Sequence, residues 1–427
     1  MTSLHDVSAD QLTALLAEQQ AKYAELSAAG LTLDLTRGKP SPEQLDLSNE
    51  LLTIDVQART SDGVDVRNYG GLQGNTELRT IFADLLNVPG DSLIAGGSSS
   101  LTLMHDTVVQ ALLYGVPGGE GPWRDQQVKF ICPVPGYDRH FAICAKLGIE
   151  MVPVEIGDNG PDLDEVAALL ADPAVKGMWA VPMYANPNGV IYDEATTRAL
   201  LELPAAAPDF RIWWDNAYAL HHLGEAEPRP LDVISMAAQA GNPDRVLAFA
   251  STSKVTFAGA GVSFLAASPA NLAAYLSGLS IATIGPDKVN QQRHVQFLGV
   301  AEGVRTLMRS HRELLAPKFA IVLDALESGL AEYDFATWTH PAGGYFVTLD
   351  VLDGTATRVV ELATQAGIAL TPAGASHPHG HDPHDRTIRI APSFPSEDDL
   401  RTAMAGLATC ALLAALEKLA GGQPSSR

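Results

Sequence analysis

Hydrophobic positions recur with helical spacing in several long segments of the chain. Between residues 7 and 29, the apolar side chains that share one helical face are Leu12, Leu15, Leu16, Tyr23 and Leu26. This segment is therefore predicted to form an amphipathic helix, and the same spacing predicts helices over residues 75–86 and 101–113. Residues 301–330 are expected to form one or two long helices with a break near Pro317, because proline interrupts helical hydrogen bonding.

Short apolar runs alternate with these helical segments through the middle of the chain. Residues 128–132 form one such run, which stops at a Pro/Gly-rich turn. Strand and helix patterns then alternate as far as residue 265, which is typical of an α/β fold with a mainly parallel sheet. Residues 343–349 and 386–390 are predicted to be strands of a second, smaller domain.

One lysine follows an apolar run where a solvated surface lysine is not expected. Lys254 comes directly after the run at residues 246–250 and before the glycine-rich residues 258–261. A lysine that loses its hydration gives up its charge readily and becomes an amine nucleophile, as a Schiff base with a carbonyl cofactor requires. Many lysines end strands, so the pattern alone is a weak indication.

A second apolar run ends in a carboxylate. Residues 210–214 lead into Asp215, and Tyr218 follows three residues later. A buried aspartate can hold the proton on the ring nitrogen of pyridoxal phosphate (PLP), and a tyrosine beside it can donate a hydrogen bond to the phenolic oxygen of that ring. Taken alone, this segment favours a helix-capping aspartate and a core tyrosine.

A third run, residues 178–181, breaks into a Pro/Asn/Gly turn that contains Asn186. Because a proline follows, the backbone of Asn186 is held extended and its amide can point into a cleft. Asn186, Asp215 and Lys254 are successively 29 and 39 residues apart, each about one strand–helix–strand unit. In an open α/β sheet, ligands bind beyond the carboxyl ends of the strands, where all these residues are predicted to lie.

With this ordered set, the chain resembles the class I/II aminotransferases, the fold type I PLP enzymes, from about residue 30 to about residue 415. The resemblance makes Lys254 the Schiff-base lysine and Asp215 the partner of the pyridine nitrogen. Tyr218 and Asn186 match the two donors to the phenolic oxygen of the cofactor. Within the family, the chain is most similar to a bacterial branch of aspartate aminotransferases related to the aminotransferase halves of MocR-type regulators, as residues 36–40, 251–254 and 389–395 indicate.

The resemblance also implies a fold and a division into domains. It implies an α/β fold with a large domain, in which helices flank a mainly parallel seven-stranded sheet, and a smaller α+β domain built from both termini. The expected segments are an N-terminal helix and joining segment, the PLP-binding domain, the small C-terminal domain and a disordered tail: 1–55, 56–305, 306–420 and 421–427.

Glycines and serines at residues 96–100 precede a predicted helix, where free amide protons and hydroxyl groups suit a phosphate. A serine cap without a ligand is the alternative. The resemblance places the cofactor phosphate at Ser98 and Ser99, adds Ser251 as a ligand and brings Tyr69 from a neighbouring subunit. It also implies that Tyr137 stacks on the pyridine ring.

On the substrate side, the resemblance assigns Arg389 to the α-carboxylate of an amino acid, with Gly38 and Asn186 beside it. Two features depart from the family. Val262 stands where many relatives carry an arginine for the phosphate, and no residue matches a distal arginine for a second carboxylate. The candidates for that distal cation are Arg37, Lys39, Arg139 and Lys288.

Charge and composition limit the partners and the location. The net charge of −22 excludes a nucleic-acid partner, since binding to a phosphate backbone needs the opposite sign. The three scattered cysteines are expected to be reduced and partly buried. The chain shows no signal peptide and no stretch long enough to span a membrane, so a cytoplasmic protein without membrane contact is expected. The tract with His377, His379, His381 and His384 favours a surface loop over a metal site.

Together these features predict a PLP-dependent aminotransferase that moves an amino group from L-aspartate, or a similar amino acid, to 2-oxoglutarate through a Lys254 aldimine, with no metal. A homodimer with shared active sites is expected. An aminotransferase for aromatic or neutral amino acids and a PLP-dependent lyase on the same fold are the alternatives. A MocR-like ligand-sensing domain is disfavoured, because only about 30 acidic, helical residues precede the motifs and leave no room for a DNA-binding domain.

Overall fold

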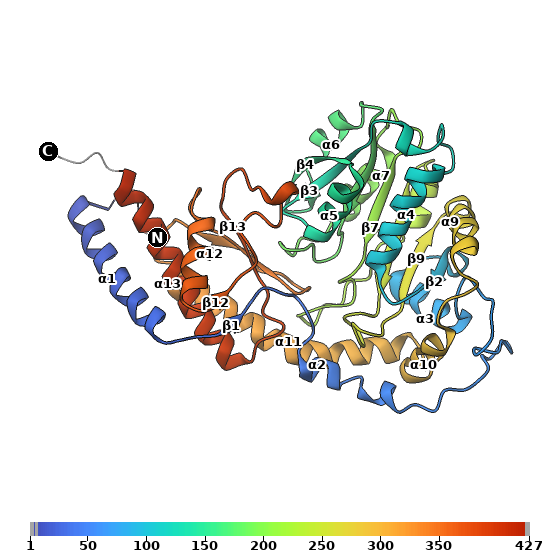
Figure 1. The fold of residues 1–427 in the computed structure, drawn as a ribbon, viewed down its shortest axis with the longest axis horizontal. Helices are drawn as coiled ribbons and strands as arrows, with labels where there is room; N and C mark the ends of the chain where they lie inside the picture. The colour runs from blue at the N-terminus through green and yellow to red at the C-terminus, as the bar shows by residue number, and fades with distance from the viewer. Residues whose placement is uncertain (1–3, 5–6, 423–427) are drawn as a thin grey trace.

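The computed structural model describes residue 4 and residues 7–422. Figure 1 shows a central sheet covered by helices and, beside it, a smaller part in which the first helix, α1 (Ala9–Ala28), and the last helix, α13 (Glu397–Gly422), lie side by side. The long helix α11 (Ala301–Leu330) runs from the sheet-containing part to the smaller part. The expected tail at residues 421–427 begins differently, since helix α13 continues through Gly422, and residues 423–427 lie outside the described residues.

The central sheet has the strand order β2-β9-β8-β7-β6-β3-β4-β5. Its strands are β2 (Leu93–Ala95), β3 (Lys129–Val134), β4 (Glu150–Gly157), β5 (Gly160–Pro161), β6 (Val175–Ala180), β7 (Arg211–Asp215), β8 (Val246–Ser251) and β9 (Ser263–Ala267). The strands from β8 to β4 pair in parallel, whereas β9 pairs antiparallel with both β8 and the edge strand β2. The expected seven strands are present as β2, β9, β8, β7, β6, β3 and β4, and the two-residue β5 adds an eighth by folding back on β4.

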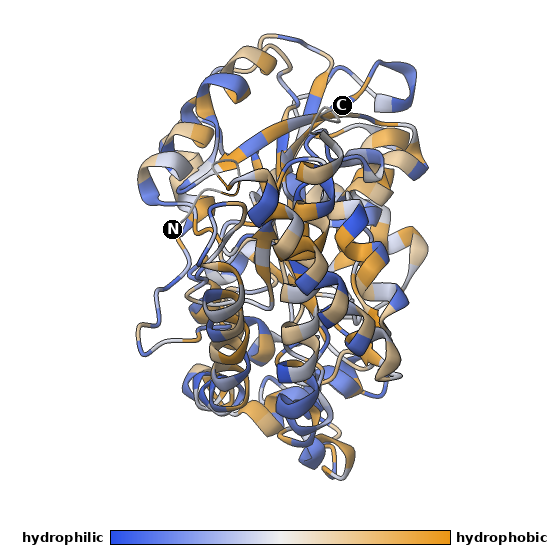
Figure 2. Cartoon of the chain, turned by 90° about the vertical axis from the view of Figure 1, so that its left-hand side faces the viewer, coloured by the Kyte–Doolittle hydropathy of each residue, from blue (hydrophilic) through white to orange (hydrophobic). Residues whose placement is uncertain are grey.

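Both faces of this sheet are buried. In β7, Ile212 and Trp214 point into one apolar layer and Trp213 into the other, which explains the unbroken apolar run of that strand. In Figure 2 the hydrophobic colour is concentrated where the helices face the sheet and one another. The helices of this part are α3 (Thr76–Leu86), α4 (Ser100–Tyr114), α5 (Asp138–Leu147), α6 (Leu163–Leu169), α7 (Glu194–Glu202), α8 (Val233–Gln239), α9 (Pro269–Ala282) and α10 (Lys288–Leu298).

The smaller part has its own apolar core, to which both ends of the chain contribute. Its sheets are the parallel pair β1-β12 and the antiparallel β10-β11-β13. The elements are α1 (Ala9–Ala28), β1 (Leu33–Asp34), α2 (Pro42–Asp46), β10 (Thr337–Trp338), β11 (Val347–Asp350), α12 (Ala356–Gln365), β12 (Ile368–Ala369), β13 (Thr387–Ile390) and α13 (Glu397–Gly422).

Helix α11 is continuous through Pro317, so the expected break at that position was wrong. A proline removes one helical N–H, but it ends a helix only if nothing else holds the flanking turns. Here Leu315 and Phe319 are buried on either side of it, and the Lys318 ammonium donates to the Ser393 carbonyl at 3.0 Å. These contacts keep both halves of the helix aligned.

Helix α13 corrects a second expectation. Among the described residues, Glu397–Gly421 forms one helix that is long and apolar enough, by length and composition, to cross a membrane. In the fold, 61% of its apolar window is buried. It packs against α1, α11 and α12, as Figure 1 also shows, so its hydrophobic surface is that of a core helix.

Candidate active site

The parallel strands β7 and β8 end at the same edge of the sheet. Asp215, the last residue of β7, pairs in register with Phe249 of β8, so the residues that follow the two strands emerge side by side. Tyr218 follows β7 and Lys254 follows β8, and the Lys254 ammonium lies 4.8 Å from the centre of the Tyr218 ring. The two segments are thus brought together as their positions in the sequence predict.

Burial shifts the protonation of Lys254. Removal from water lowers the pKa of the Lys254 amine, and the nearby carboxylate of Asp215 opposes this shift only in part. The free amine is therefore more populated at neutral pH than on a surface lysine. A nucleophilic amine and a base for carbon-bound protons both require this form.

The carboxylate of Asp215 is buried and has two different partners. The backbone N–H of Ala217 donates to its Oδ1 at 3.1 Å, and His140 Nε2 lies 3.2 Å from its Oδ2. The His140 ring in turn stacks on Trp179 at 4.3 Å, and Tyr137 meets it edge-on at 4.9 Å. Asp215 thus ends a strand in a buried polar cluster, and no helix begins there for it to cap.

His140 was not predicted from the sequence. A signal was present, because His140 lies three residues after Tyr137 and so falls on the same face of the first turn of α5. A single histidine in an apolar helix is nevertheless most often a core residue with its hydrogen bonds satisfied. Only the folded chain shows that its ring meets the candidate carboxylate.

Two tyrosines near this cluster remain protonated at neutral pH. Burial raises the pKa of Tyr137 to about 12, with a further contribution from the charge of Asp215. Burial also raises the pKa of Tyr218 well above its ordinary value. Both phenols can therefore donate a hydrogen bond to a ligand in this site.

Arg389, on β13, brings a buried positive charge to the same place. Its Nη1 donates to Asn186 Oδ1 at 3.4 Å and to Asp138 Oδ1 at 3.3 Å, and its Nη2 donates to Thr371 Oγ1 at 3.3 Å. Its Nε is buried and has no hydrogen-bond partner among the described residues. A guanidinium held by long bonds with one donor unused can still bind a carboxylate.

The aromatic ring of Phe346 lies between Gly38 and Arg389 and contacts both. The Arg389 guanidinium sits 4.9 Å from the centre of the Phe346 ring, and a Cβ at Gly38 would collide with the edge of the same ring. A glycine is therefore required where the N-terminal segment crosses the small-domain strands. This contact places the predicted substrate-side segment beside the predicted carboxylate-binding residue.

The loops expected to hold a phosphate line one cavity of about 340 Å³. Residues 96–98 form one wall and residues 259–262 another. Ser99 is the N-cap residue of α4, yet its side chain makes no capping hydrogen bond, which weakens the alternative of a simple serine cap. The Ser253 hydroxyl, from the turn after β8, donates to the Ser98 carbonyl at 3.4 Å.

The side chain of Val262 is buried in the core, so position 262 brings no charge to this cavity. Arg293 of α10 lines the cavity and supplies a positive charge to its wall. Ser251 ends β8 behind the same loop, where its hydroxyl donates to the Ser253 hydroxyl at 3.1 Å. Of the expected phosphate residues, Ser98 lines this cavity together with the Arg293 guanidinium and the Asp287 carboxylate, whereas Ser99 and Ser251 are not part of its lining.

The remaining candidates make no hydrogen bond to Lys254, Asp215 or Arg389 in the described part of the chain. Arg37, Lys39 and Arg139 are exposed, and the Lys39 ammonium sits over the Phe394 ring at 3.7 Å. Lys288 is buried, and its ammonium donates to the Gly70 carbonyl at 2.6 Å. Tyr69, next to Gly70, is 82% exposed.

The histidine-rich loop is only partly a surface loop. His379, His381 and His384 are exposed as expected, whereas His377 is buried because the loop folds its first residue against the large domain. Among the described residues, no group of three or more His, Cys, Asp or Glu side chains could hold a metal ion. Cys132, Cys144 and Cys410 are free and fully buried, deeper than the sequence indicated.

A mainly parallel sheet with a lysine, an aspartate and a tyrosine at neighbouring strand ends, faced by a buried arginine from a small domain, defines the fold type I aminotransferases. The family model described as "Aspartate amino-transferase" matches residues 7–423, and the chain belongs to this family.

Similar proteins named as aminotransferases match nearly the full length of the chain. An aminotransferase of Mycolicibacterium smegmatis is 56% identical over 98% of this chain and 99% of its own length. An aspartate aminotransferase of Corynebacterium glutamicum is 50% identical over 98% of each chain. The crystal structure of an aspartate transaminase from Corynebacterium glutamicum has a TM-score of 0.96 at 50% identity and covers 98% of this chain and 99% of that chain.

Proposed function

We propose that this aminotransferase uses pyridoxal 5'-phosphate to move an amino group from L-aspartate, or a similar dicarboxylic amino acid, to 2-oxoglutarate. The observation that supports this proposal best is the Lys254 amine, held 4.8 Å from the Tyr218 ring with its pKa lowered by burial beside Asp215. The aspartate aminotransferase named above is similar to this chain over its whole length, which supports aspartate as the donor.

The residues present fit the cofactor. Lys254 would hold its carbonyl carbon, and Asp215 would keep the proton on its ring nitrogen. Tyr218 and Asn186 would donate to its phenolic oxygen, Tyr137 would cover its ring, and Ser98, Ser99 and Ser251 would bind its phosphate. When bound, the cofactor supplies an electron sink for the bond to the amino-acid Cα and stores the amino group.

The residues of this chain account for binding and proton transfer. Arg389 binds the α-carboxylate, since its Nε and the outer edge of its guanidinium match the two oxygens of a carboxylate. Lys254 removes the proton from Cα as a free amine and returns it as an ammonium. The turn bond from Ala217 and the contact with His140 hold the Asp215 side chain in place beside the expected position of the ring nitrogen.

An absorbance titration tests cofactor and substrate together. The purified enzyme should absorb as a lysine-bound pyridoxal species, and L-aspartate or L-glutamate should convert it stoichiometrically to the pyridoxamine form. L-alanine and L-phenylalanine should convert it only at much higher concentration. Preferential conversion by an aromatic or neutral amino acid would replace the proposed substrate, whereas decomposition of the amino acid without the pyridoxamine form would indicate a lyase.

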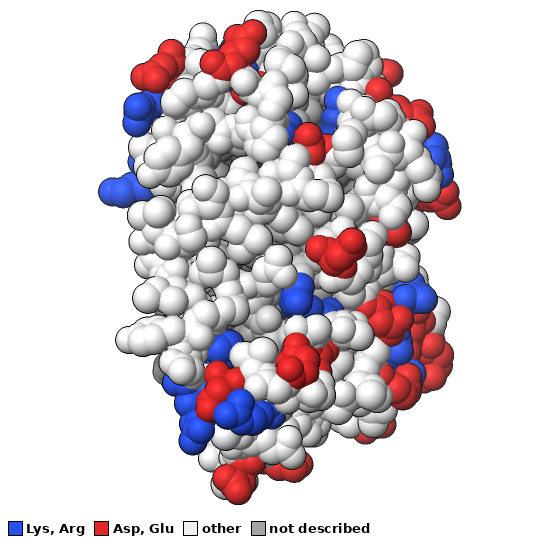
Figure 3. Space-filling view, turned by 90° about the vertical axis from the view of Figure 1, so that its right-hand side faces the viewer, with Lys and Arg blue, Asp and Glu red and all other residues white. Residues whose placement is uncertain are grey.

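We further propose that the enzyme is a homodimer with shared active sites. In Figure 3, the face that carries α4 and α9 in Figure 1 has a broad uncharged area, with charges mostly toward its edges and lower part. Large apolar side chains are exposed at the ends of these helices, including Tyr114 and, at 89%, Ile281. A second copy of the chain is the occupant that explains both this surface and the 82% exposure of Tyr69.

Hybrid dimers test this arrangement. A Lys254→Ala chain is mixed with a Tyr69→Phe chain, each inactive or weakened alone. If Tyr69 serves the site of its partner, a hybrid contains one doubly defective site and one intact site, so activity should reappear on mixing. Verified subunit exchange without any recovery would show that each site is complete within one chain.

A further inference from the structure

The turn that carries Lys254 leaves two of its own carbonyl groups without backbone partners. After β8, the N–H groups of Val255 and Thr256 donate to the Thr252 carbonyl at 2.9 and 2.8 Å, which makes a single helical turn. No helix continues from it, so no backbone N–H in the described part of the chain donates to the carbonyls of Lys254 or Val255. Such groups in a protein interior need another donor.

Two buried histidines supply these donors. His221, in the loop after β7, places its Nε2 3.2 Å from the Lys254 carbonyl oxygen. His311, on α11, places its Nε2 3.0 Å from the Val255 carbonyl oxygen. The two side chains are only 3% and 1% exposed, and they approach the turn from elements about 90 residues apart in the chain.

The surroundings define which nitrogen of each ring carries the hydrogen. The amide nitrogen of Gln44, which can only donate, lies 3.0 Å from His311 Nδ1, so the hydrogen of His311 is on Nε2 and points at Val255. The Nδ1 of His221 has no hydrogen-bond partner among the described residues, and its Nε2 faces a carbonyl that can only accept. Burial lowers the pKa of His221 to about 3 and also lowers that of His311, so both rings are neutral donors.

A third histidine holds the next residue of the same turn. His294 Nδ1 lies 2.8 Å from the Asn290 carbonyl, which places its hydrogen on Nδ1. Its Nε2 is then an acceptor and lies 2.9 Å from the Thr256 hydroxyl. Three consecutive residues of the turn, Lys254, Val255 and Thr256, are therefore each bonded to a histidine from a different segment.

We propose that His221 and His311 are positioning residues, which hold the backbone of Lys254 so that its amine keeps one geometry during proton transfer. The proposal rests on Lys254 being the catalytic lysine. A displacement of about 1 Å at a reacting group can cost about a hundredfold in rate. A neutral ring fixes the backbone without adding a positive charge next to an amine that has to lose its own.

Paired substitutions separate positioning from simple packing. His311→Gln keeps a donor nitrogen near the position of Nε2, whereas His311→Leu keeps the bulk and removes the donor. The control is His377→Leu, which removes a buried histidine in the loop before β13 whose Nε2 lies 3.8 Å from Asp382 Oδ1. For each purified enzyme with bound cofactor, the measurements are kcat, KM, melting temperature and the pH dependence of the absorbance of the bound cofactor.

We expect His311→Leu to lower kcat by about tenfold or more, with little change in KM, and to shift the midpoint of the absorbance titration. His311→Gln should restore most of kcat and the original midpoint. His377→Leu should change only the melting temperature. The proposal is wrong if His311→Leu keeps the wild-type kcat and midpoint, or if the Leu and Gln variants lose activity equally.

Two further results keep the test decisive. If His311→Leu does not fold, the pair His221→Gln and His221→Leu asks the same question at the Lys254 carbonyl. If Lys254→Ala is inactive while every histidine variant behaves like the wild type, the positioning role falls and the proposed function stands. An active Lys254→Ala enzyme would overturn both.

Discussion

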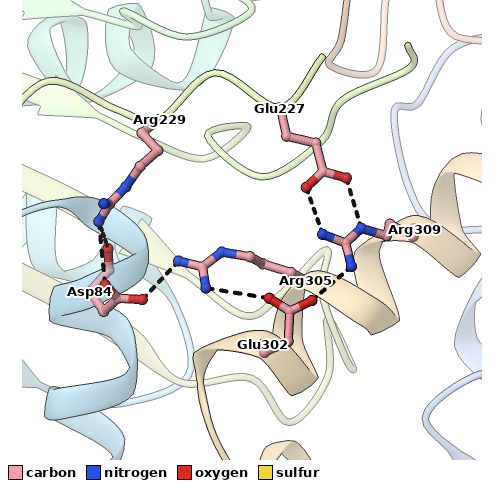
Figure 4. A network of polar contacts seen from close by, with 6 residues as sticks. All are labelled: Asp84, Glu227, Arg229, Glu302, Arg305 and Arg309. Atoms are coloured by element: carbon pink, nitrogen blue, oxygen red, sulfur yellow. Dashed lines mark hydrogen bonds and ion pairs between the residues drawn. The ribbon is translucent and has the colours of Figure 1, made fainter. Parts of the chain in front are cut away.

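Two polar clusters of this protein use similar residue types in opposite surroundings. The buried cluster joins Lys254, Asp215 and Arg389 at the strand ends, where each charge has few partners. The more exposed cluster in Figure 4 joins α3, α11 and the segment before α8 through bonds from Arg305 and Arg229 to the Asp84 carboxylate at 2.7 and 3.3 Å. Helix α11 contacts both regions. Its Arg309 belongs to the cluster in Figure 4, and its His311, two residues later, contacts the turn that carries Lys254.

Solvent exposure decides what each cluster contributes. Exposed ion pairs are screened by water and salt and contribute about 0–1 kcal/mol each. A buried group with one specific partner shifts its pKa, orients a reactant and cannot be replaced by water. The density of charges in Figure 4 is therefore a poor guide to function, and the sparse cluster is the one that we expect to be sensitive to substitution.

The largest effect is expected for Lys254→Ala. The substitution removes both the covalent attachment of the cofactor and the proton carrier, so turnover should fall on the order of 10⁴-fold or more. The variant should still bind the cofactor without a covalent bond, and its circular dichroism should be unchanged. Near wild-type turnover would place the chemistry elsewhere.

Asp215→Asn should have the next largest effect. Asparagine keeps the shape and the turn, but it has no charge to hold a proton on the ring nitrogen. The first half-reaction, followed by stopped-flow absorbance, should slow on the order of 10²-fold while the melting temperature changes little. A reduction of less than tenfold would mean that Asp215 mainly serves the turn at Ala217.

Arg389→Lys tests the proposed binding site for the α-carboxylate, which the small domain contributes. Lysine keeps the charge but loses the paired geometry, so the apparent affinity should fall about thirtyfold for every amino donor alike. Alanine substitutions at Arg37, Lys39, Arg139 and Lys288 provide the contrast, since a distal cation should affect aspartate and glutamate selectively. If all four leave the preference for aspartate over alanine unchanged, the dicarboxylate assignment loses its basis.

The smallest effect is expected in the exposed cluster. Glu302→Ala removes contacts with Arg305 and Arg309 and should lower the free energy of unfolding by less than about 1 kcal/mol, with kcat unchanged. The difference from the wild type should shrink further in high salt. A loss of activity comparable to that of Asp215→Asn would remove the contrast between the two clusters.

Much of the site could be predicted because its chemistry is local in the sequence. Asn186, Asp215 and Lys254 each follow an apolar run, and parallel strands bring such positions to one edge. The alternation of strand-like and helix-like hydrophobic patterns was also sufficient to predict the α/β fold. The two-residue strand β5 and the continuity of α11 through Pro317 depend on contacts with distant segments, which no local pattern contains.

The roles of the histidines in the site also depend on contacts with distant segments, so they could not be predicted from the sequence. His140, His221 and His311 carry no motif, and each acts through a partner that is remote in the chain. A lone histidine in an apolar segment has the same local pattern whether it fills space or donates to the backbone of a catalytic lysine. Their roles follow from tertiary distances and from the tautomer that a neighbour such as Gln44 imposes.

Reduction of the purified enzyme with sodium borohydride, followed by peptide mass mapping, tests the central claim most directly. We predict one modified residue, Lys254, carrying the mass of a reduced pyridoxyl phosphate group, and no such modification after prior conversion with L-aspartate. Labelling of another lysine such as Lys288, or no labelling of an enzyme that is active, would contradict the assignment of the site.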